Sequence, residues 1–134
     1  MNEEALTRVK NLMKRTPACR YRRCDISHWD YRGKWLPAGK PLLIPEDMSA
    51  DAVGHAGGTR WFHRQGFAIV RPNYDFMVSA RYGNLWWWDA ICSFFDMEED
   101  HLRYMLFEPE SPQVVINRIT EHLGAVKGKE FIHA

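Results

Sequence analysis

A hairpin turn in the second half of the chain constrains the fold more than any other feature. Two apolar, strand-like runs, residues 76–82 and 85–95, flank the dipeptide Gly83-Asn84. A two-residue loop between such runs is a strong short-range signal for a β-hairpin. We therefore predict an antiparallel pair of strands in which Tyr82 faces Leu85.

The predicted register sorts three consecutive tryptophans onto two faces. Neighbouring residues of a strand point to opposite sides, so Trp87 would face the core, while Trp86 and Trp88 would lie beside Arg81 and Ser79. Paired indoles with an adjacent guanidinium form a surface that stacks on a planar ligand or on a partner's side chain. The alternative is that helices cover both faces and all three indoles belong to the core.

Residues 85–95 also permit a second interpretation, a buried helix capped by Asn84, because the run is apolar without interruption. We favour the strand. Residues 67–70 and 102–107 then add two more strands, and residues 67–107 form a four-stranded antiparallel meander.

Helices at the start and end of the chain are predicted from apolar spacing and from proline and glycine. An N-terminal helix covers residues 3–16 and ends at Pro17. Its apolar positions are Leu6, Val9, Leu12 and Met13. A C-terminal helix begins at Ser111-Pro112 and stops at Gly124. Residues 125–134 then form a short tail that adds an edge strand or frays.

A middle helix is predicted to follow Ser49, its expected cap. Each glycine in a helix interior costs roughly 1 kcal/mol, so Gly54, Gly57 and Gly58 are expected to break this helix before Trp61. Short edge strands from residues 18–44 complete the sheet. The predicted fold is α+β, with an antiparallel sheet of about four to six strands packed by N-terminal, middle and C-terminal helices.

Composition indicates one globular, intracellular domain spanning residues 1–134. Hydrophobic residues make up 46% of the chain and charged residues 26%, a balance unlike that of disordered proteins. We expect no membrane span and no signal peptide. Three cysteines cannot all pair within one chain, so we expect reduced thiols and a cytoplasmic location.

Positive charge is concentrated near the N-terminus, although the net charge is only +1. Arg20, Arg22 and Arg23 alternate with aromatic residues, as in proteins that bind single-stranded nucleic acid, and Trp35 follows them. No helix-turn-helix, zinc-finger or RNP motif accompanies this segment. A solvated, charged strand is therefore the simpler interpretation.

Two local patterns suggest weaker hypotheses for a site. Cys19, Cys24 and His28, with His55 or His63, supply enough donors for zinc, but their spacing is poor, so we predict no metal site. His28 and Asp30 would share a strand face and are, with His63, weak candidates for acid–base catalysis.

Residues 54–60 are glycine-rich but lack the Lys-Ser/Thr ending of a phosphate-binding loop, so we expect a flexible connection. Next to them, Arg60, Trp61, His63 and Arg64 form a second polar and aromatic cluster.

The functional prediction is a small, non-enzymatic binding or regulatory protein that engages or inhibits a protein partner and needs no cofactor. Trp, Tyr and Arg dominate binding hot spots, and no arrangement of nucleophile, base and oxyanion donors competes with them. The predicted contact residues are Arg20, Arg22, Arg23, Trp35, Arg60, Trp61, Arg81, Trp86 and Trp88.

Two alternatives remain open. The first is recognition of a nucleotide or single-stranded nucleic acid by stacking on Trp86 and Trp88, with arginines contacting phosphates. The second is a small enzyme that uses His28, Asp30 or His63. The sequence leaves the oligomeric state undetermined.

Overall fold

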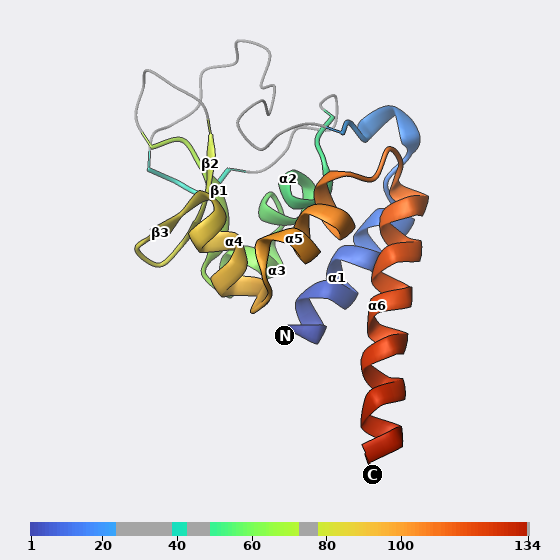
Figure 1. Cartoon of the computed structure of the whole chain (residues 1–134). Coiled ribbons are helices and arrows are strands. Elements are labelled where there is room, and N and C mark those ends of the chain that lie inside the picture. The colour runs from blue at the N-terminus through green and yellow to red at the C-terminus, as the bar shows by residue number, and fades with distance from the viewer. Residues whose placement is uncertain (24–38, 43–48, 73–77, 134) are drawn as a thin grey trace.

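A three-stranded antiparallel sheet lies on one side of the molecule, and the long helices α1 and α6 lie on the other (Figure 1). The structure, a computed structural model, describes residues 1–23, 39–42, 49–72 and 78–133. In chain order the elements are α1 (Glu3–Lys14), the 3₁₀ turn η1 (Ala18–Arg20), α2 (Ala52–Gly57), α3 (Arg60–Arg64), β1 (Phe67–Val70), β2 (Ser79–Tyr82), β3 (Leu85–Trp86), α4 (Trp87–Phe95), α5 (Glu99–Leu102), the π-helical turn η3 (Arg103–Phe107) and α6 (Pro112–His133). The α+β class is as predicted.

The predicted hairpin turn is confirmed. In the β2–β3 pair Tyr82 faces Leu85 and Arg81 faces Trp86, and Gly83 takes the positive φ of 60° that glycine adopts at little cost. β1 pairs with the other edge of β2, with Phe67 opposite Tyr82.

The strand prediction for residues 85–95 is wrong beyond Trp86. The chain enters α4 at Trp87, so the cross-strand pairs predicted for Trp87 and Trp88 do not form. The rival helix interpretation describes residues 87–95 correctly, although the N-cap is Trp86 and not Asn84. The buried residues Ala90, Ile91, Phe94 and Phe95 share one helical face, which explains why a helix satisfies this apolar run.

Residues 102–107 are also helical and not a strand. α5 continues directly into the π-helical turn η3, and both turn their apolar side chains inward. Leu102, Met105 and Leu106 are buried at spacings of three and four residues, which is a helical period. The four-stranded meander is therefore replaced by a three-stranded sheet and two helical segments.

The edge strands expected in residues 18–44 fall partly outside the described residues, which omit 24–38 and 43–48. The described part forms η1 and two isolated bridges, Tyr21 with Ala50 and Pro41 with Val70. A sheet of four to six strands is therefore not confirmed.

The N-terminal helix is confirmed as α1. Asn2 caps it by accepting a hydrogen bond from the Ala5 backbone N–H at 3.1 Å, and Leu6, Val9 and Met13 are buried. Leu12 is partly buried against the same core.

The middle helix is split as the glycines predicted, because α2 ends at Gly57 and α3 begins at Arg60. Its cap is the buried Asp51, which accepts from the Gly54 N–H at 2.8 Å, and not Ser49. A carboxylate is a strong N-cap and here satisfies a helix-terminal donor inside the protein.

The C-terminal helix starts at Pro112 as predicted but does not stop at Gly124. α6 runs on to His133, so residues 125–133 are helical and not a tail. Its far half extends away from the other elements (Figure 1). One glycine costs only about 1 kcal/mol in a helix interior, which the neighbouring turns of α6 offset.

An aromatic cluster joins the sheet to α3 and α4. The Phe67 and Phe94 rings stack with centroids 4.7 Å apart, and the Phe62 ring lies 5.7 Å from that of Phe94. Phe95 completes the cluster, and its ring meets Phe94 edge to face. Tyr82 of β2 also meets Phe94 edge to face, with ring centroids 5.3 Å apart, so the cluster holds the β2–β3 hairpin against α4. In the part of the chain that the structure describes, no helix has the length and apolar character needed to cross a membrane.

Candidate binding surface

Three partly exposed indoles stand where the hairpin passes into α4, and we call Trp86, Trp87 and Trp88 the tryptophan corner. Trp87 has a φ of 57°, in the left-handed region that bulky residues rarely adopt. Such a conformation costs on the order of 1–3 kcal/mol and persists only where the surroundings hold it. The chain changes here from strand to helix within one residue, so consecutive indoles spread apart.

Trp86 lies on the hairpin with the arginine that the sequence assigned to it. The Arg81 guanidinium carbon is 5.9 Å from the Trp86 ring centre, at the outer limit of a cation–π contact. Leu85 beside it is 39% exposed, which is unusual among the large apolar side chains that the structure describes. The hairpin tip therefore presents apolar and cationic groups together.

Trp88 belongs to a different set of contacts from the one predicted. Its ring packs against Phe107 with centroids 4.9 Å apart, and Arg103 lies 4.4 Å above it. The Arg103 Nε also donates to Glu99 at 2.9 Å. The prediction that Trp88 shares a face with Arg81 and Ser79 is wrong, because the second residue of α4 is turned toward α5 and η3.

The corner is neither wholly core nor wholly surface. Trp87 and Trp88 pack with one side against the hydrophobic core. Among the described side chains, Trp86 is not part of that cluster, although it is partly buried. The alternative that all three indoles are core is therefore not supported for Trp86.

Acidic groups accompany the arginines near Trp88. Burial raises the pKa of the Cys92 thiol, and the carboxylates of Glu99 and Asp89 raise it further. The surface beside Trp88 thus carries both signs of charge.

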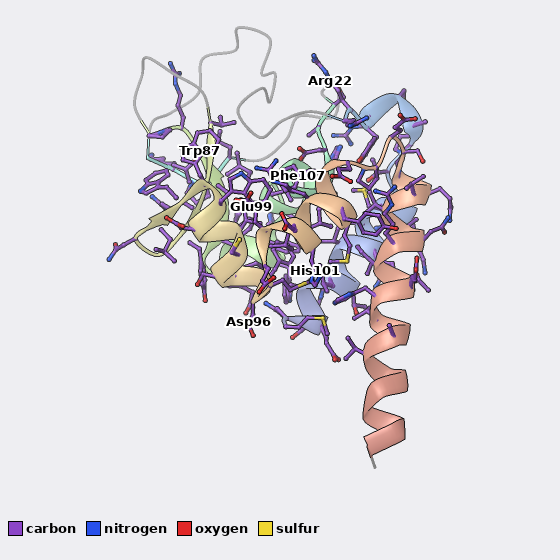
Figure 2. The ribbon with its side chains drawn as sticks, viewed as in Figure 1. Arg22, Trp87, Asp96, Glu99, His101 and Phe107 are labelled. Atoms are coloured by element: carbon purple, nitrogen blue, oxygen red, sulfur yellow. The ribbon has the colours of Figure 1, made fainter. Side chains whose placement is uncertain are left out.

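The predicted basic segment lies away from the tryptophan corner. Figure 2 shows Arg22 and Trp87 well separated on the molecule. The Arg22 backbone N–H donates to the Ala50 carbonyl, and the Arg23 side chain pairs with Glu110 at 3.7 Å. Arg20 lies in η1, where its carbonyl contacts His55. Trp35 falls outside the described residues.

The cluster around Trp61 forms another location. Arg60 is exposed, whereas Trp61 is partly buried, with its ring 4.9 Å from Phe62 and with Arg8 4.8 Å away. Trp61 therefore already has a cationic partner within the chain.

The weaker hypotheses gain nothing from the structure. The His63 Nε2 lies 2.7 Å from the Gly57 carbonyl and donates to it. Residues 54–57 lie in the buried helix α2, so this glycine-rich stretch does not expose a phosphate-binding loop. His28 and Asp30, the predicted dyad, lie outside the described residues, as does Cys24.

His55 is buried and neutral in character. Its Nε2 lies 2.6 Å from the Arg20 carbonyl, which can only accept, so that nitrogen carries the proton. Burial lowers the pKa of His55, and the charge of Arg20 adds to that effect, while backbone hydrogen bonds partly oppose it. The hydrogen bond of His55 therefore links α2 to η1.

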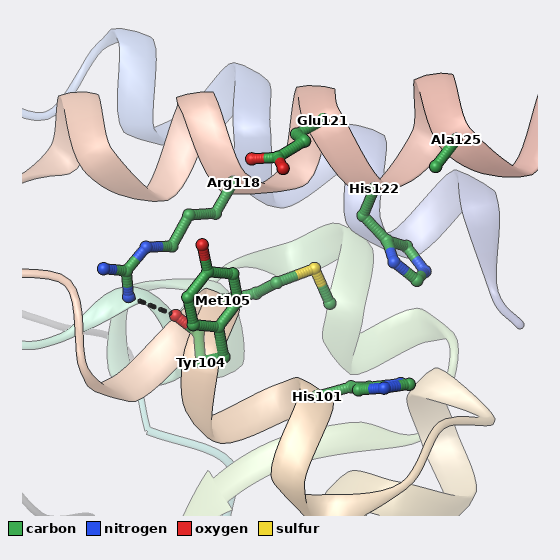
Figure 3. A pocket seen from close by; sticks show the side chains of 7 residues that line it. All are labelled: His101, Tyr104, Met105, Arg118, Glu121, His122 and Ala125. Atoms are coloured by element: carbon green, nitrogen blue, oxygen red, sulfur yellow. Dashed lines mark hydrogen bonds between the residues drawn. The ribbon is translucent and has the colours of Figure 1, made fainter.

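A cavity between α5–η3 and α6 was not predicted. Its volume is about 240 Å³. Its lining, drawn in Figure 3, consists of His101, Tyr104, Met105, Arg118, Glu121, His122 and Ala125. The Arg118 Nη1 donates to the Tyr104 carbonyl at 2.6 Å, and its guanidinium lies 4.1 Å from the Tyr104 ring centre. No local sequence pattern marks this site, because the residues come from segments joined only by the fold.

Comparison with known proteins gave no match, whether to a family model, to a curated protein or to a solved structure.

Proposed function

We propose that this protein is a non-enzymatic binding protein that engages a protein partner through the tryptophan corner, with Arg81 and Arg103 at its sides. The observation that carries the proposal is that three consecutive indoles all remain partly exposed at a strained junction. Tryptophan and arginine are the residues most enriched in binding hot spots. A partly exposed indole offers a large, rigid contact area at a small cost in conformational entropy.

The charge pattern favours a protein over a nucleic acid as the partner. The stacking alternative assigns phosphate contacts to Arg20, Arg22, Arg23 and Arg81, and of these Arg81 alone lies over an indole of the tryptophan corner in the described part of the chain. Asp89 and Glu99 lie near Trp88, and carboxylates repel a phosphate backbone. Mixed charges around an apolar centre are typical of a protein interface.

A quantitative affinity purification tests the proposal. Tagged wild-type protein and a Trp86→Ala variant are compared as baits in extracts of the source cells, with Tyr104→Ala, at an exposed aromatic outside the tryptophan corner, as the control. Trp86 is the preferred target because it lies outside the core cluster, so the variant should fold normally by circular dichroism. A partner protein should be recovered by wild type and by the control and be depleted with Trp86→Ala.

The affinity of the recovered partner for wild type and for Trp86→Ala then tests whether Trp86 lies in the interface. A hot-spot tryptophan contributes roughly 2 kcal/mol or more, which corresponds to a loss of about 30-fold in Kd when it is truncated. Equal affinity of wild type and Trp86→Ala would refute the tryptophan corner as the interface. Recovery of nucleic acid whose binding falls steeply with salt would instead favour the stacking alternative.

A further inference from the structure

Arginines lie over indole rings at three places in the described part of the chain. The pairs, with the distance from the guanidinium carbon to the ring centre, are Arg103 over Trp88 at 4.4 Å, Arg8 over Trp61 at 4.8 Å and Arg81 over Trp86 at 5.9 Å. A cation–π contact of this kind places a positive charge against each indole. The three places differ in what balances that charge.

Two of the three arginines pair with a carboxylate of the chain itself. The Arg103 Nε lies 2.9 Å from the Glu99 Oε2, and the Arg8 Nη2 lies 3.9 Å from the Glu4 Oε1. In both cases the acid precedes the arginine by four residues on a helix, a spacing that brings the two side chains together on one face. At Trp88 and at Trp61 the fold therefore supplies the indole, the guanidinium and the carboxylate.

Arg81 lacks such a carboxylate because it lies on a strand. Its neighbours on the same face are Ser79 along β2, Ala68 across the sheet on β1 and Trp86 on β3, and none of them is acidic. Arg81 forms no ion pair with any carboxylate that the structure describes, including that of the exposed Asp89 on α4. Its positive charge is balanced by water alone.

A partner that covers Trp86 must also deal with this charge. Arg81 faces Trp86 across the β2–β3 pair and is itself only partly exposed, so a surface that buries the indole removes water from the guanidinium as well. Burying a charge is costly unless an opposite charge pairs with it. A carboxylate fits best, because it accepts two parallel hydrogen bonds from a guanidinium.

We propose that the partner of the tryptophan corner supplies this carboxylate, from an Asp or Glu close to a large apolar side chain that covers Trp86. The inference rests on the proposed function, because it specifies the chemistry of the partner at the same surface. Binding completes at Trp86 the arrangement of indole, guanidinium and carboxylate that the fold builds by itself at Trp61 and Trp88.

Random dodecapeptides displayed on phage are the probe for this chemistry. They are selected in parallel on immobilised wild-type protein and on Trp86→Ala, and sequences enriched only on wild type are those that bind the tryptophan corner. These sequences should carry an Asp or Glu close to a large apolar residue. One enriched peptide is then synthesised, and its Kd is measured by isothermal titration calorimetry.

A double-mutant cycle tests for direct pairing with Arg81. Arg81→Gln, and replacement of the peptide's acid by its amide, should each weaken binding by about 10–100-fold, the range for hydrogen bonds to charged groups. Both changes together should cost little more than either one alone, because they remove the same interaction. Arg81→Lys keeps the charge without the paired donors and should lose less.

Two controls separate this effect from damage to the protein. Arg8→Gln removes an arginine that lies over Trp61 and already pairs with Glu4, so it should leave the Kd of the peptide unchanged. The amide variant of the peptide leaves the protein unaltered, so it tests the carboxylate even where Arg81→Gln does not fold.

The outcomes distinguish this inference from the proposed function. Peptides that need Trp86 but contain no acidic residue, or that bind Arg81→Gln as tightly as wild type, would overturn the inference and leave the proposed function standing. A selection without any peptide that depends on Trp86 would overturn both.

Discussion

Gly57→Ala should destabilise the protein, because the added methyl has no room. A Cβ at this last residue of α2 would lie 2.4 Å from the Ile69 Cγ1, 2.5 Å from its Cδ1 and 3.2 Å from its backbone nitrogen. Ile69 is fully buried in β1, and its carbonyl accepts from the Leu42 N–H at 2.9 Å, so the strand cannot retreat freely.

The magnitude follows from two opposing terms. Overpacking a core costs roughly 1–3 kcal/mol. Replacing glycine by alanine within a helix recovers at most about 1 kcal/mol, and less at a helix end. The fixed position of Ile69 places the cost near the upper part of the range, so the net loss should be about 1–2 kcal/mol. Urea unfolding should show a lower midpoint at an unchanged m-value.

Gly124→Ala is the matched control. Nothing lies within 4 Å of a Cβ at this position in α6, so the same substitution should stabilise the protein by up to about 1 kcal/mol. In a double-mutant cycle, Ile69→Ala should relieve part of the Gly57→Ala loss, because the new methyl enters the space left by Ile69. The steric reasoning would be refuted if both glycine variants changed stability in the same direction.

Two further predictions concern titratable groups. Burial holds the pKa of His55 below its ordinary value of about 6.5, so the unfolded chain takes up the proton first. The free energy of unfolding should therefore fall as the pH drops below about 6.5, and His55→Gln should flatten this decline; an unchanged slope in urea titrations would contradict it. Burial, Glu99 and Asp89 raise the pKa of Cys92, so in single-cysteine variants iodoacetamide should alkylate it more slowly at pH 8 than exposed Cys19. Mass spectrometry measures both rates, and Glu99→Gln should accelerate the reaction of Cys92; equal rates for Cys92 and Cys19 would contradict the inference.

The sequence predicted correctly the parts of the fold that depend on a few neighbouring residues. The turn at Gly83-Asn84, the start of α6 at Pro112 and the apolar face of α1 each depend on a few neighbouring residues. Such signals act through turn geometry, a fixed φ or helical spacing, so one sequence suffices to interpret them.

The failures occurred where a neighbouring signal was given more weight than the local period. Residues 87–95 place Asp89 and Ser93 on the exposed side of α4 and Ala90, Ile91, Phe94 and Phe95 on its buried side, which is a helical period. The strong hairpin signal that precedes them outweighed this period in the prediction. Residues 102–107 showed a helical spacing of buried residues, but the expectation of a returning strand outweighed it. Gly124 is tolerated because α6 gains enough elsewhere to offset a single glycine.

The sequence predicted some of the residues of the tryptophan corner but not how they are arranged. The sequence predicted that Trp86, Trp88 and Arg81 lie on one face. Because the chain changes from β3 to α4 at Trp87, Trp88 instead contacts Arg103 and Phe107. The cavity with His101 and His122 was missed, because these residues are brought together only by the packing of α6.

Packing accounts for part of the tryptophan corner, and the remainder points to Trp86. Complete burial of a large apolar side chain contributes roughly 1.5–3 kcal/mol, so the partial burial of Trp87 against the core offsets part of the strain in its backbone. Trp88 is likewise explained by Phe107 beneath it. Trp86 gains least, since its described partner is a guanidinium 5.9 Å away at the edge of the sheet. A partner that covers Trp86 would remove its remaining exposed surface from water, and for this reason Trp86 is the first position to test.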